Sequence, residues 1–523
     1  MYRSVPPQQA DDQAEIITFL EASDSHGIDQ PVVRLDTHIS HIFLAGDRAY
    51  KLKRAVRLDY LDFSTLAKRR QACMTELWLN RRTAPDLYLY VQSINRQADG
   101  SIGFGPGEPV DWLVVMQRFE DRALLSDVAA QGGLTPRLIN QLADTIAHFH
   151  ASLPGIVADE SRARVRAVIE ENDRCLSLHR NKIYPALDVE KLLIMSELQL
   201  EKLAPLLDLR AQSGHIRHCH GDLHLANICL WKDVPTLFDC LEFNKELAII
   251  DVLYDIAFLL MDLWHLGFRP EANALFNRYL DMTGEAGGIA AMPLFLSMRA
   301  AVRAHVSATQ SAMAGDDRQK QQLTDGAERY LSTALELLHV SSPQLVVIGG
   351  LSGTGKSTLA RAIAPKLGLP IGARLLRTDV LRKRMLGFAP EERLDEQAYG
   401  PDQNEKVYHR LLDEIVGALA SGWSVIADGV FARQETRERI EALATEAQVP
   451  FTGIWLEAPA DVLKARVDNR THDASDANAE IVERQLQSEV GSLDEWHFID
   501  SRGEHENIAA TVLSLLPKSE MPA

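Results

Sequence analysis

Two stretches of the chain hold residue types that can transfer a phosphoryl group. In "HGDLHLANIC" (220–229), Asp222 can accept the proton of an acceptor hydroxyl, and Asn227 can supply a neutral metal ligand from the same loop. In "LFDCLEF" (237–243), Asp239 follows an apolar strand and can supply an anionic metal ligand. Phosphoryl transfer needs a base for the acceptor and oxygen ligands for Mg²⁺, and these segments offer both.

The second stretch, "GLSGTGKS" (350–357), fits the pattern G-x-x-x-x-G-K-[ST]. It follows an apolar strand and opens a predicted helix, which is the context that a phosphate-binding loop needs. Lys356 would reach the β- and γ-phosphate oxygens and Ser357 would bind Mg²⁺, while the helix N-terminus adds a favourable dipole. The remaining predicted nucleotide contacts come from the loop itself and the start of the helix: Gly350, Gly353, Gly355 and Thr358.

The first stretch resembles the catalytic loop and metal-binding aspartate of the protein-kinase-like fold, in the form found in aminoglycoside and choline phosphotransferases. The resemblance implies a lysine on an early strand, which "AYKLK" supplies as Lys51. Lys53 points the same way on that strand and is the alternative. Glu76, in the following helix, would be the partner of the lysine.

The same resemblance assigns the rest of the nucleotide site. Ala49 would face the nucleotide, and "VVMQRF" (114–119) would be the hinge that offers backbone hydrogen bonds to adenine. The chain departs from the protein-kinase pattern because no GxGxxG precedes the lysine. Ser40 and nearby backbone N–H groups in "DTHISHIF" (36–43) would cover the phosphates instead.

Charged residues downstream of the P-loop suggest an acceptor site. Asp379 and Arg382 form D-x-x-R in "LLRTDVLRKRM": the carboxylate would orient or deprotonate the acceptor hydroxyl, and the arginine would hold acceptor or phosphate. Asp428 ends an apolar run and is a candidate Walker-B carboxylate. Arg466 and Arg470 lie on one helix face and could close as a lid that neutralises charge on the γ-phosphoryl group. The plainer alternatives are a helix N-cap for Asp379 and a solvated helix face for the two arginines.

Residues of about 341–515 resemble the gluconate-kinase, polynucleotide-kinase and zeta-toxin group of P-loop kinases. For the first stretch, two other interpretations exist. The protein-kinase-like fold could be a pseudokinase, although the chemistry residues are present. A zinc site could use His215, His218, Cys219, His220 and His224, but their spacing is irregular and the catalytic loop already explains His220. His148 and His150 are expected to pack in a helix.

The predicted elements support two domains. Short strands before residue 118, followed by helical patterns from residue 134, predict an N-terminal bilobal α+β protein-kinase-like fold. Strands at 345–349, 424–428 and 451–456 alternate with helices at 356–367, 433–446 and 460–470, which predicts a C-terminal α/β P-loop NTPase with a parallel sheet. We expect domains at 1–326 (N-lobe about 30–118, C-lobe about 119–326) and 341–523, with a connector helix at 327–340.

Composition limits the location and the partners. The chain has 523 residues, a net charge of −18 and five cysteines without a CxxC pair, so we expect a reduced cytoplasmic protein and no nucleic-acid partner. The N-terminus lacks the apolar core of a secretory signal. The apolar stretch at 248–268 contains Asp251, Asp255 and Asp262, which predicts a buried helix rather than a membrane span.

The whole chain resembles a bacterial family of fusions in which an aminoglycoside-phosphotransferase-like domain precedes a P-loop kinase. The resemblance implies two ATP- and Mg²⁺-dependent kinase domains acting on hydroxyl groups of small molecules. One alternative is that a regulatory ATP-binding domain controls the other domain. Another is that the P-loop domain phosphorylates a nucleic-acid 5′-hydroxyl or a nucleotide-sugar. Neither acceptor, and no oligomeric state, follows from the sequence.

Overall fold

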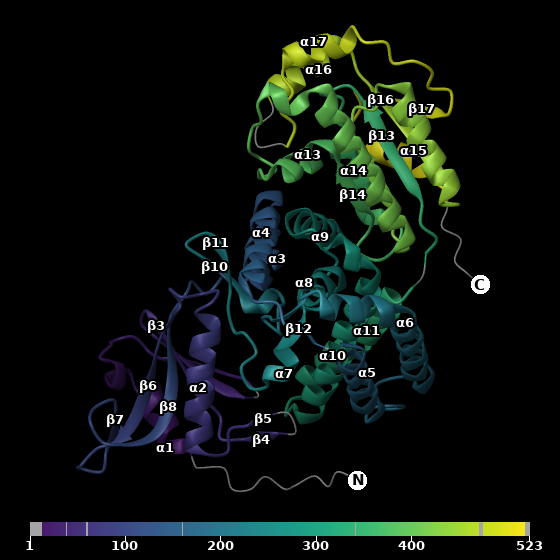
Figure 1. Ribbon diagram of the computed structural model, residues 1–523. Coiled ribbons are helices and arrows are strands. Elements are labelled where there is room, and N and C mark those ends of the chain that lie inside the picture. Colours follow the sequence, from purple (N-terminus) through teal and green to yellow (C-terminus); the bar gives the residue numbers. More distant parts are fainter. Residues whose placement is uncertain are drawn as a thin grey trace. The chain divides into compact units, whose positions relative to one another are not determined.

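The computed structural model describes residues 13–37, 39–58, 61–158, 161–339, 341–469 and 474–517 (Figure 1). Its contacts divide the chain into two compact units. The first joins Met1–Val157 to Gly214–Leu259, and the second joins Ala158–Ser213 to Leu260–Ala523. The segment 220–229, called the catalytic-loop segment below, therefore belongs to the same unit as the strands before residue 118.

The first unit is built around a six-stranded antiparallel sheet with helix α2 (Leu66–Asn80) packed along it (Figure 1). Thr65 caps α2, because its hydroxyl accepts a hydrogen bond from the Lys68 N–H. Alternate strand residues such as Phe43, Leu52 and Leu113 are fully buried. In spatial order the strands are β1 (Val33–Asp36), β2 (Ser40–Ala45), β3 (Arg48–Lys53), β8 (Glu108–Gln117), β6 (Tyr88–Arg96) and β7 (Ile102–Gly103).

The catalytic-loop segment of this unit is held by two small antiparallel ladders. Strand β9 (Ile216–His218) pairs with β12 (Ile249–Asp251), and β10 (Ile228–Trp231) pairs with β11 (Val234–Leu237). Helix α8 (Val252–His265) follows β12 and is buried along nearly its whole length, as the sequence predicted for the 248–268 stretch. Within the described residues, no helix is long and apolar enough to cross a membrane.

The second unit begins with a helical part. It contains α5 (Ser161–Ser177), α6 (Ala186–Gln212), α9 (Arg269–Thr283), α10 (Met292–Met313) and α11 (Asp317–Leu337). Helix α11 starts ten residues before the expected connector at 327, because Asp316 caps it by accepting a hydrogen bond from the Gln319 N–H at 2.9 Å. Its polar first half is exposed.

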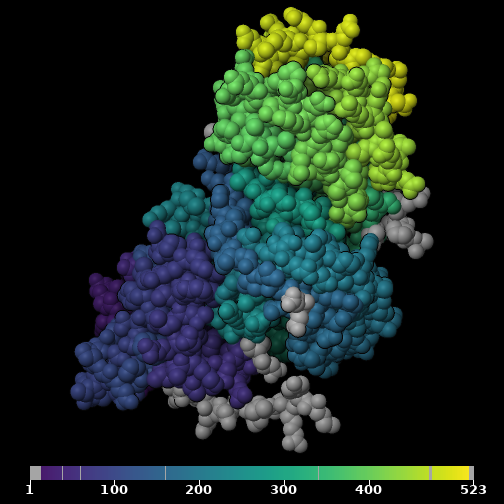
Figure 2. Space-filling model, viewed as in Figure 1, coloured from purple at the N-terminus to yellow at the C-terminus, as the bar shows by residue number. Residues whose placement is uncertain are grey.

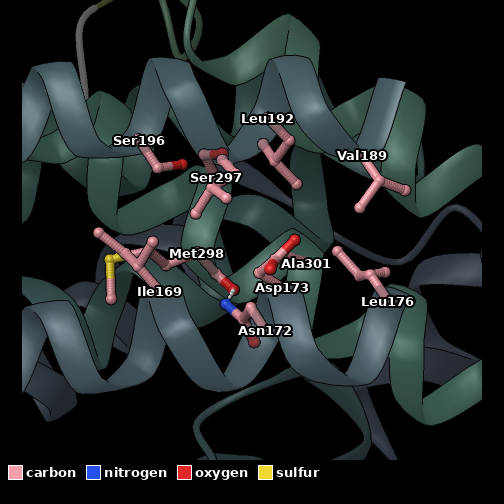
Figure 3. Close-up of a pocket in the computed structure, with 11 residues that line it drawn as sticks. Ile169, Asn172, Asp173, Leu176, Val189, Leu192, Ser196, Ser297, Met298 and Ala301 are labelled. Atoms are coloured by element: carbon pink, nitrogen blue, oxygen red, sulfur yellow. Dashed lines mark hydrogen bonds between the residues drawn. The ribbon is translucent and has the colours of Figure 1, made fainter. Parts of the chain in front are cut away.

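A small cavity lies between α5, α6 and α10 (Figure 3). Its volume is about 10 Å³, and it is lined mainly by apolar side chains together with Asn172, Asp173, Ser196 and Ser297. Asn172 donates a hydrogen bond across it to the Met298 carbonyl at 3.2 Å. A space of this size holds one water molecule at most, so it is a packing defect rather than a ligand site.

The P-loop part of the second unit is a five-stranded parallel sheet in the order β14-β15-β13-β16-β17. Four of its strands, in chain order, are β13 (Leu345–Gly350), β14 (Arg374–Arg377), β15 (Val425–Asp428) and β16 (Phe451–Glu457). The fifth is β17 (Trp496–Asp500). The parallel α/β fold predicted from the sequence is thus confirmed.

Helices flank the sheet, and the three that the sequence predicted at 356–367, 433–446 and 460–470 are present, the first of them ending at Ile363. The flanking helices are α12 (Lys356–Ile363), α13 (Thr378–Leu386), α14 (Pro401–Ala420), α15 (Gln434–Glu446), α16 (Ala460–Asp468), α17 (Ala479–Leu486) and α18 (His505–Leu515). In the space-filling view, the yellow atoms that include α16 and α17 form an outer layer on the green P-loop part (Figure 2).

The edge strand β14 is covered by polar side chains of α9. Asn277 accepts a hydrogen bond from the Leu375 N–H at 2.8 Å and donates one to the Ala373 carbonyl at 3.1 Å. Arg374, fully buried, donates to Asp281 at 2.5 Å. An open strand edge exposes unpaired backbone groups. Here α9, from the helical part of the same unit, satisfies them.

Candidate active sites

Lys51 on β3 lies in the centre of the first candidate site. Its ammonium group is 2.8 Å from Oε1 of Glu76 on α2 and 2.5 Å from Oδ1 of Asp239. Burial alone would lower the pKa of Lys51, but the carboxylates of Asp239 and Glu76 raise it well above its usual range. The two carboxylates thus favour the charged form of Lys51, and the structure brings together three residues that are far apart in the sequence.

Asp239 sits in a strained loop. Its φ angle of 61° is in the left-handed region, which non-glycine residues adopt rarely. The loop is held by the Tyr88 hydroxyl, which accepts a hydrogen bond from the Asp239 N–H, and by the Asn80 side chain, which accepts one from the Cys240 N–H. The carboxylate is 37% exposed, so it can reach a ligand in solution.

Asp222 and Asn227 form the second cluster of this site. The Asn227 amide nitrogen donates to Oδ2 of Asp222 at 2.9 Å, which leaves the amide oxygen as the atom that can bind a metal. The Asp222 side chain is 40% exposed, as a base that must meet an acceptor should be. The Phe238 N–H donates to the Asn227 carbonyl at 3.0 Å, which ties this loop to the residue before Asp239.

Gly221 and Asp255 explain how the loop keeps its shape. Gly221 has φ +84°, and a Cβ there would lie 3.1 Å from Cβ of Leu241 and 3.2 Å from Cβ of Ala248. Its N–H donates to Oδ1 of Asp255 at 2.8 Å, and the His220 N–H donates to Oδ2. The position therefore requires glycine, and the buried carboxylate fixes the backbone beside Asp222.

His150 was expected to be a packing histidine, and it does lie buried in α4 (Pro136–Ser152). Its Nε2 atom is also 3.1 Å from Oδ2 of Asp255, so it supports the loop through that carboxylate. Sequence reasoning gave Asp255 no role beyond interrupting an apolar stretch. A signal was present, because an aspartate inside a buried helix needs hydrogen-bond donors.

The zinc alternative gains no support. Among the described residues, His150, Cys219 and Asp255 form the group whose ligand atoms lie within 4.8 Å of one another, and Cys219 alone comes from the cluster considered in the sequence. Asp255 already accepts hydrogen bonds from the loop, and Cys219 donates to the Ile250 carbonyl at 3.5 Å. Hydrogen bonding accounts for the cluster without a metal.

The other predicted contacts of the nucleotide lie around β3. Ala49 pairs with Met116 of the predicted hinge strand β8 and is buried. Ser40 pairs across the sheet with Lys53, and its hydroxyl is buried without a hydrogen-bond partner among the described residues. The Ser40 side chain therefore lies inside the fold in this structure, and the Ser40 backbone N–H donates a hydrogen bond to the Thr37 hydroxyl.

The second candidate site is centred on Ser357 at the start of α12. Its hydroxyl donates to Oδ2 of Asp428, which ends β15, at 2.5 Å. Arg377, at the end of the neighbouring strand β14, is 3.3 Å from the same carboxylate oxygen. The ammonium group of Lys356 donates to the Leu351 carbonyl at 2.9 Å. The structure thus joins the predicted P-loop serine to the predicted Walker-B carboxylate.

Backbone conformation and close contacts explain why glycines occupy these positions of the P-loop. Gly353 has φ +87°, and a Cβ there would lie 2.6 Å from the Leu463 carbonyl oxygen. Gly350 has φ +139°, with a Cβ position 2.6 Å from the Leu456 carbonyl oxygen. Gly355 has φ +90° and caps α12, and Thr358 lies in the first turn of that helix. A side chain at Gly353 would push the loop away from α16, and one at Gly350 would push it away from β16.

Asp379 is half-buried in the first turn of α13, next to the end of β14. Burial raises its pKa above the ordinary value, while Arg377 acts in the opposite direction. Arg382 does not point at open space, because it donates to the Ala398 carbonyl at 2.8 Å and to Asn404 at 2.7 Å. Arg382 therefore ties α13 to Ala398 and to Asn404 of α14 in this structure.

Arg466 on α16 lies against the P-loop. It donates to the Gly353 carbonyl at 3.4 Å and to the Ser501 carbonyl at 2.8 Å. Arg470 lies outside the described residues. A contact that the sequence did not indicate also reaches the loop: the Ser352 N–H donates to the Gln485 side chain of α17 at 2.8 Å. Two helices of the outer layer thus touch the phosphate-binding loop.

The donor atoms at both sites suit Mg²⁺, which prefers oxygen ligands and binds proteins through one or two carboxylates. At the first site these are the carboxylate of Asp239 and the amide oxygen of Asn227. At the second they are the hydroxyl of Ser357 and the carboxylate of Asp428, which already touch each other. Both sets fit a magnesium-bound nucleotide.

Comparison with known proteins supports the two-domain interpretation. Residues 103–293 match the family model of the phosphotransferase enzyme family, and residues 345–490 match that of the AAA domain. The uncharacterized protein Rv2004c of Mycobacterium tuberculosis is 31% identical over 492 residues, which cover 92% of this chain and 95% of the relative. The chain belongs to the family of Rv2004c.

Two further similarities concern single domains. A shikimate kinase of Rhodopseudomonas palustris is 34% identical over 137 residues, covering 26% of this chain and 60% of that enzyme. The crystal structure of a choline/ethanolamine kinase family protein from Mesorhizobium loti is 14% identical, covers 59% of this chain and 93% of that one, and has a TM-score of 0.36. The chain joins an aminoglycoside-phosphotransferase-like domain to a P-loop kinase domain, and it is a kinase.

Proposed function

We propose that the chain has two Mg²⁺·ATP sites, each of which phosphorylates a hydroxyl group of a small molecule. The observation that supports the proposal is that, at each candidate site, residues from distant segments predicted to bind phosphate or metal lie in contact. The first combines Lys51, Glu76 and Asp239 with the pair Asp222 and Asn227. The catalytic domains would be residues 1–326 and 341–523, joined by the 327–340 segment, in a cytoplasmic protein.

At the first site, Asp222 would accept the proton of the acceptor hydroxyl as the oxygen attacks. Lys51, held by Glu76, would bind the phosphates, and Asp239 and Asn227 would hold the metal. Bound Mg²⁺ would neutralise the charge that builds up on the transferred group. The 40% exposure of Asp222 and the burial of Lys51 match this division between acceptor side and phosphate side.

At the second site, backbone N–H groups of the loop 350–357 and the ammonium group of Lys356 would hold the phosphates. Asp428 would complete the metal site. Asp379 would orient or deprotonate the acceptor hydroxyl, with Arg382 fixing the pocket wall. Arg466 and Arg470 would approach the γ-phosphoryl group. The contact of Arg466 with Gly353 supports its part of this arrangement.

The first test is ATP consumption by the wild type, Asp222→Ala, Lys356→Ala and the double variant, with candidate hydroxyl compounds. Two working kinases predict that each single variant keeps part of the turnover and that the double variant loses all of it. If Lys356→Ala abolishes turnover and Asp222→Ala changes nothing, the first domain is a regulatory module rather than a kinase. A mass-spectrometric screen for compounds that gain one phosphate would identify the acceptors.

A further inference from the structure

Strand β3 carries a second lysine that the proposed chemistry does not use. Lys53 lies two residues after Lys51 and therefore on the same face of the strand. Both lysines reach Glu76: Lys51 lies 2.8 Å from Oε1, and Lys53 lies 2.5 Å from Oε2. Lys53 also donates to Oε1 of Glu242. The side chains of Lys53 and Glu76 are fully buried, and that of Glu242 is 4% exposed.

Glu242 follows Asp239 by three residues, so the loop that carries the predicted metal ligand touches β3 at two points. At the outer point Asp239 pairs with Lys51, and at the inner point Glu242 pairs with Lys53. The two points differ in access, because the Asp239 side chain is 37% exposed and the Glu242 side chain is 4% exposed. A nucleotide can therefore reach the outer pair but not the inner one.

In the proposed function the outer pair has to separate. Lys51 would turn to the phosphates, and Asp239 would turn to the metal. Asp239 would then lose its ionic contact with β3 although its backbone is strained, with φ 61°. Such strain persists only where the surrounding structure imposes it. The inner pair can impose it, because separating Lys53 from Glu242 would take the ammonium partner away from the buried Glu242 carboxyl, while Lys53 keeps Glu76.

We propose that Lys53 and Glu242 are positioning residues that keep Asp239 aimed at the metal while Lys51 changes partner. This inference rests on the proposed function of the first site. It gives the two lysines separate tasks: Lys51 binds phosphate, and Lys53 anchors the metal loop. Glu76 serves both, since each of its carboxylate oxygens faces a different lysine.

The test uses the full-length protein carrying Lys356→Ala, so that the P-loop site does not contribute to nucleotide binding. Glu242→Gln, Lys53→Met and the variant with both changes are compared with Lys51→Met. Glu246→Gln, an exposed glutamate just beyond the loop, is the matched control. Calorimetry measures the affinity for ADP without metal and then the Mg²⁺ concentration that gives half-maximal tightening. Thermal unfolding shows which variants are folded.

We expect Glu242→Gln and Lys53→Met to raise the required Mg²⁺ concentration about 10- to 100-fold, the range seen when residues that orient metal ligands are removed. Metal-free ADP binding stays near the parent value in both, because Lys51 is intact, whereas Lys51→Met weakens it. The double variant shows the same Mg²⁺ defect as either single variant rather than their product, because both remove one contact. If a single variant does not fold, the Mg²⁺ requirement is measured on the double variant, which removes both charges.

Two results overturn the inference. One is an unchanged Mg²⁺ requirement in folded Glu242→Gln or folded double variant. The other is a loss of metal-free ADP binding in Lys53→Met as large as in Lys51→Met, which would make Lys53 a phosphate ligand. Failure of the proposed function looks different: the Lys356→Ala parent itself then binds no nucleotide, and the inference fails with it.

Discussion

Oδ1 of Asp255 accepts a hydrogen bond from the N–H of Gly221 at 2.8 Å, immediately before the predicted base Asp222. Its other oxygen accepts from the His220 N–H and lies 3.1 Å from Nε2 of His150. Both carboxylate oxygens are therefore acceptors. An amide in this position would turn an NH₂ group toward backbone N–H donors, which is repulsive.

We therefore expect Asp255→Asn to reduce turnover at the first site by about 10²-fold, the cost of a displacement of about 1 Å in a catalytic group. Rates are measured in the Lys356→Ala background, with thermal unfolding in parallel. Asp233→Asn, an exposed aspartate in the β10–β11 turn, is the matched control and should behave as the parent. A folded Asp255→Asn variant with parental turnover would remove Asp255 from the set of loop-positioning residues.

Asp222→Asn should separate chemistry from nucleotide binding. The Asp222 side chain is 40% exposed and contacts Asn227. Lys51 is held by Glu76 and Asp239, so the variant leaves the contacts of Lys51 in place. General base catalysis contributes about 10²- to 10⁴-fold, and kcat at the first site should fall by that factor. The affinity for Mg²⁺·ADP, measured by calorimetry, should stay within about twofold of the parent. Equal losses in both quantities would show that Asp222 acts on the nucleotide.

The pH dependence of the second site follows from the burial of Asp379. Burial raises the pKa of this carboxyl above its ordinary value, and Arg377 partly offsets the increase. A base must be ionised, so the rate falls as the pH drops through the raised pKa. In the Asp222→Ala background, the acid limb should lie above pH 4, near which an ordinary aspartate titrates.

Arg377→Met tests whether Asp379 is the group whose titration sets the acid limb. Removing a cation that lowers the pKa of Asp379 should shift the acid limb of the rate profile to higher pH. Arg502→Met, at an exposed arginine, should leave the limb in place. A limb that stays in place in Arg377→Met would assign the titration to another group.

Much of the fold was predictable because it depends on local signals. The apolar runs ending at Gly350 and Asp428 predicted the central strands within a residue or two. The roles of Lys51, Asp222 and Lys356 stay predictions. Motif residues are predictable in this way because phosphate chemistry restricts both residue type and spacing.

The supporting contacts were not predictable. His150 and Asp255 are 105 residues apart, and Lys53 and Glu242 are 189 residues apart, with no spacing rule that links them. Their pairing depends on how strands and helices pack in three dimensions. A buried charge in an apolar context indicates that a partner exists, but the sequence does not say which residue it is.

Because α9 contacts β14, we expect the stability of the P-loop part to depend on the helical part of the same unit. Asn277 satisfies the Leu375 N–H and the Ala373 carbonyl, and its side-chain oxygen also accepts from Arg374 at 3.0 Å. Asn277→Leu leaves these groups buried without that partner. Each such group costs about 1–3 kcal/mol, so the free energy of unfolding should fall by at least that amount.

Thermal and denaturant unfolding of the full-length variant measure this loss. Asn507→Leu, at an exposed position of α18, is the control and should unfold like the wild type. Because β14 leads directly into the helix that carries Asp379, the Asn277→Leu variant should also raise the KM for the acceptor of the second site more than the KM for ATP. Equal stability of Asn277→Leu and Asn507→Leu would mean that water replaces the asparagine at the edge of the sheet, and that the P-loop sheet holds its shape without α9.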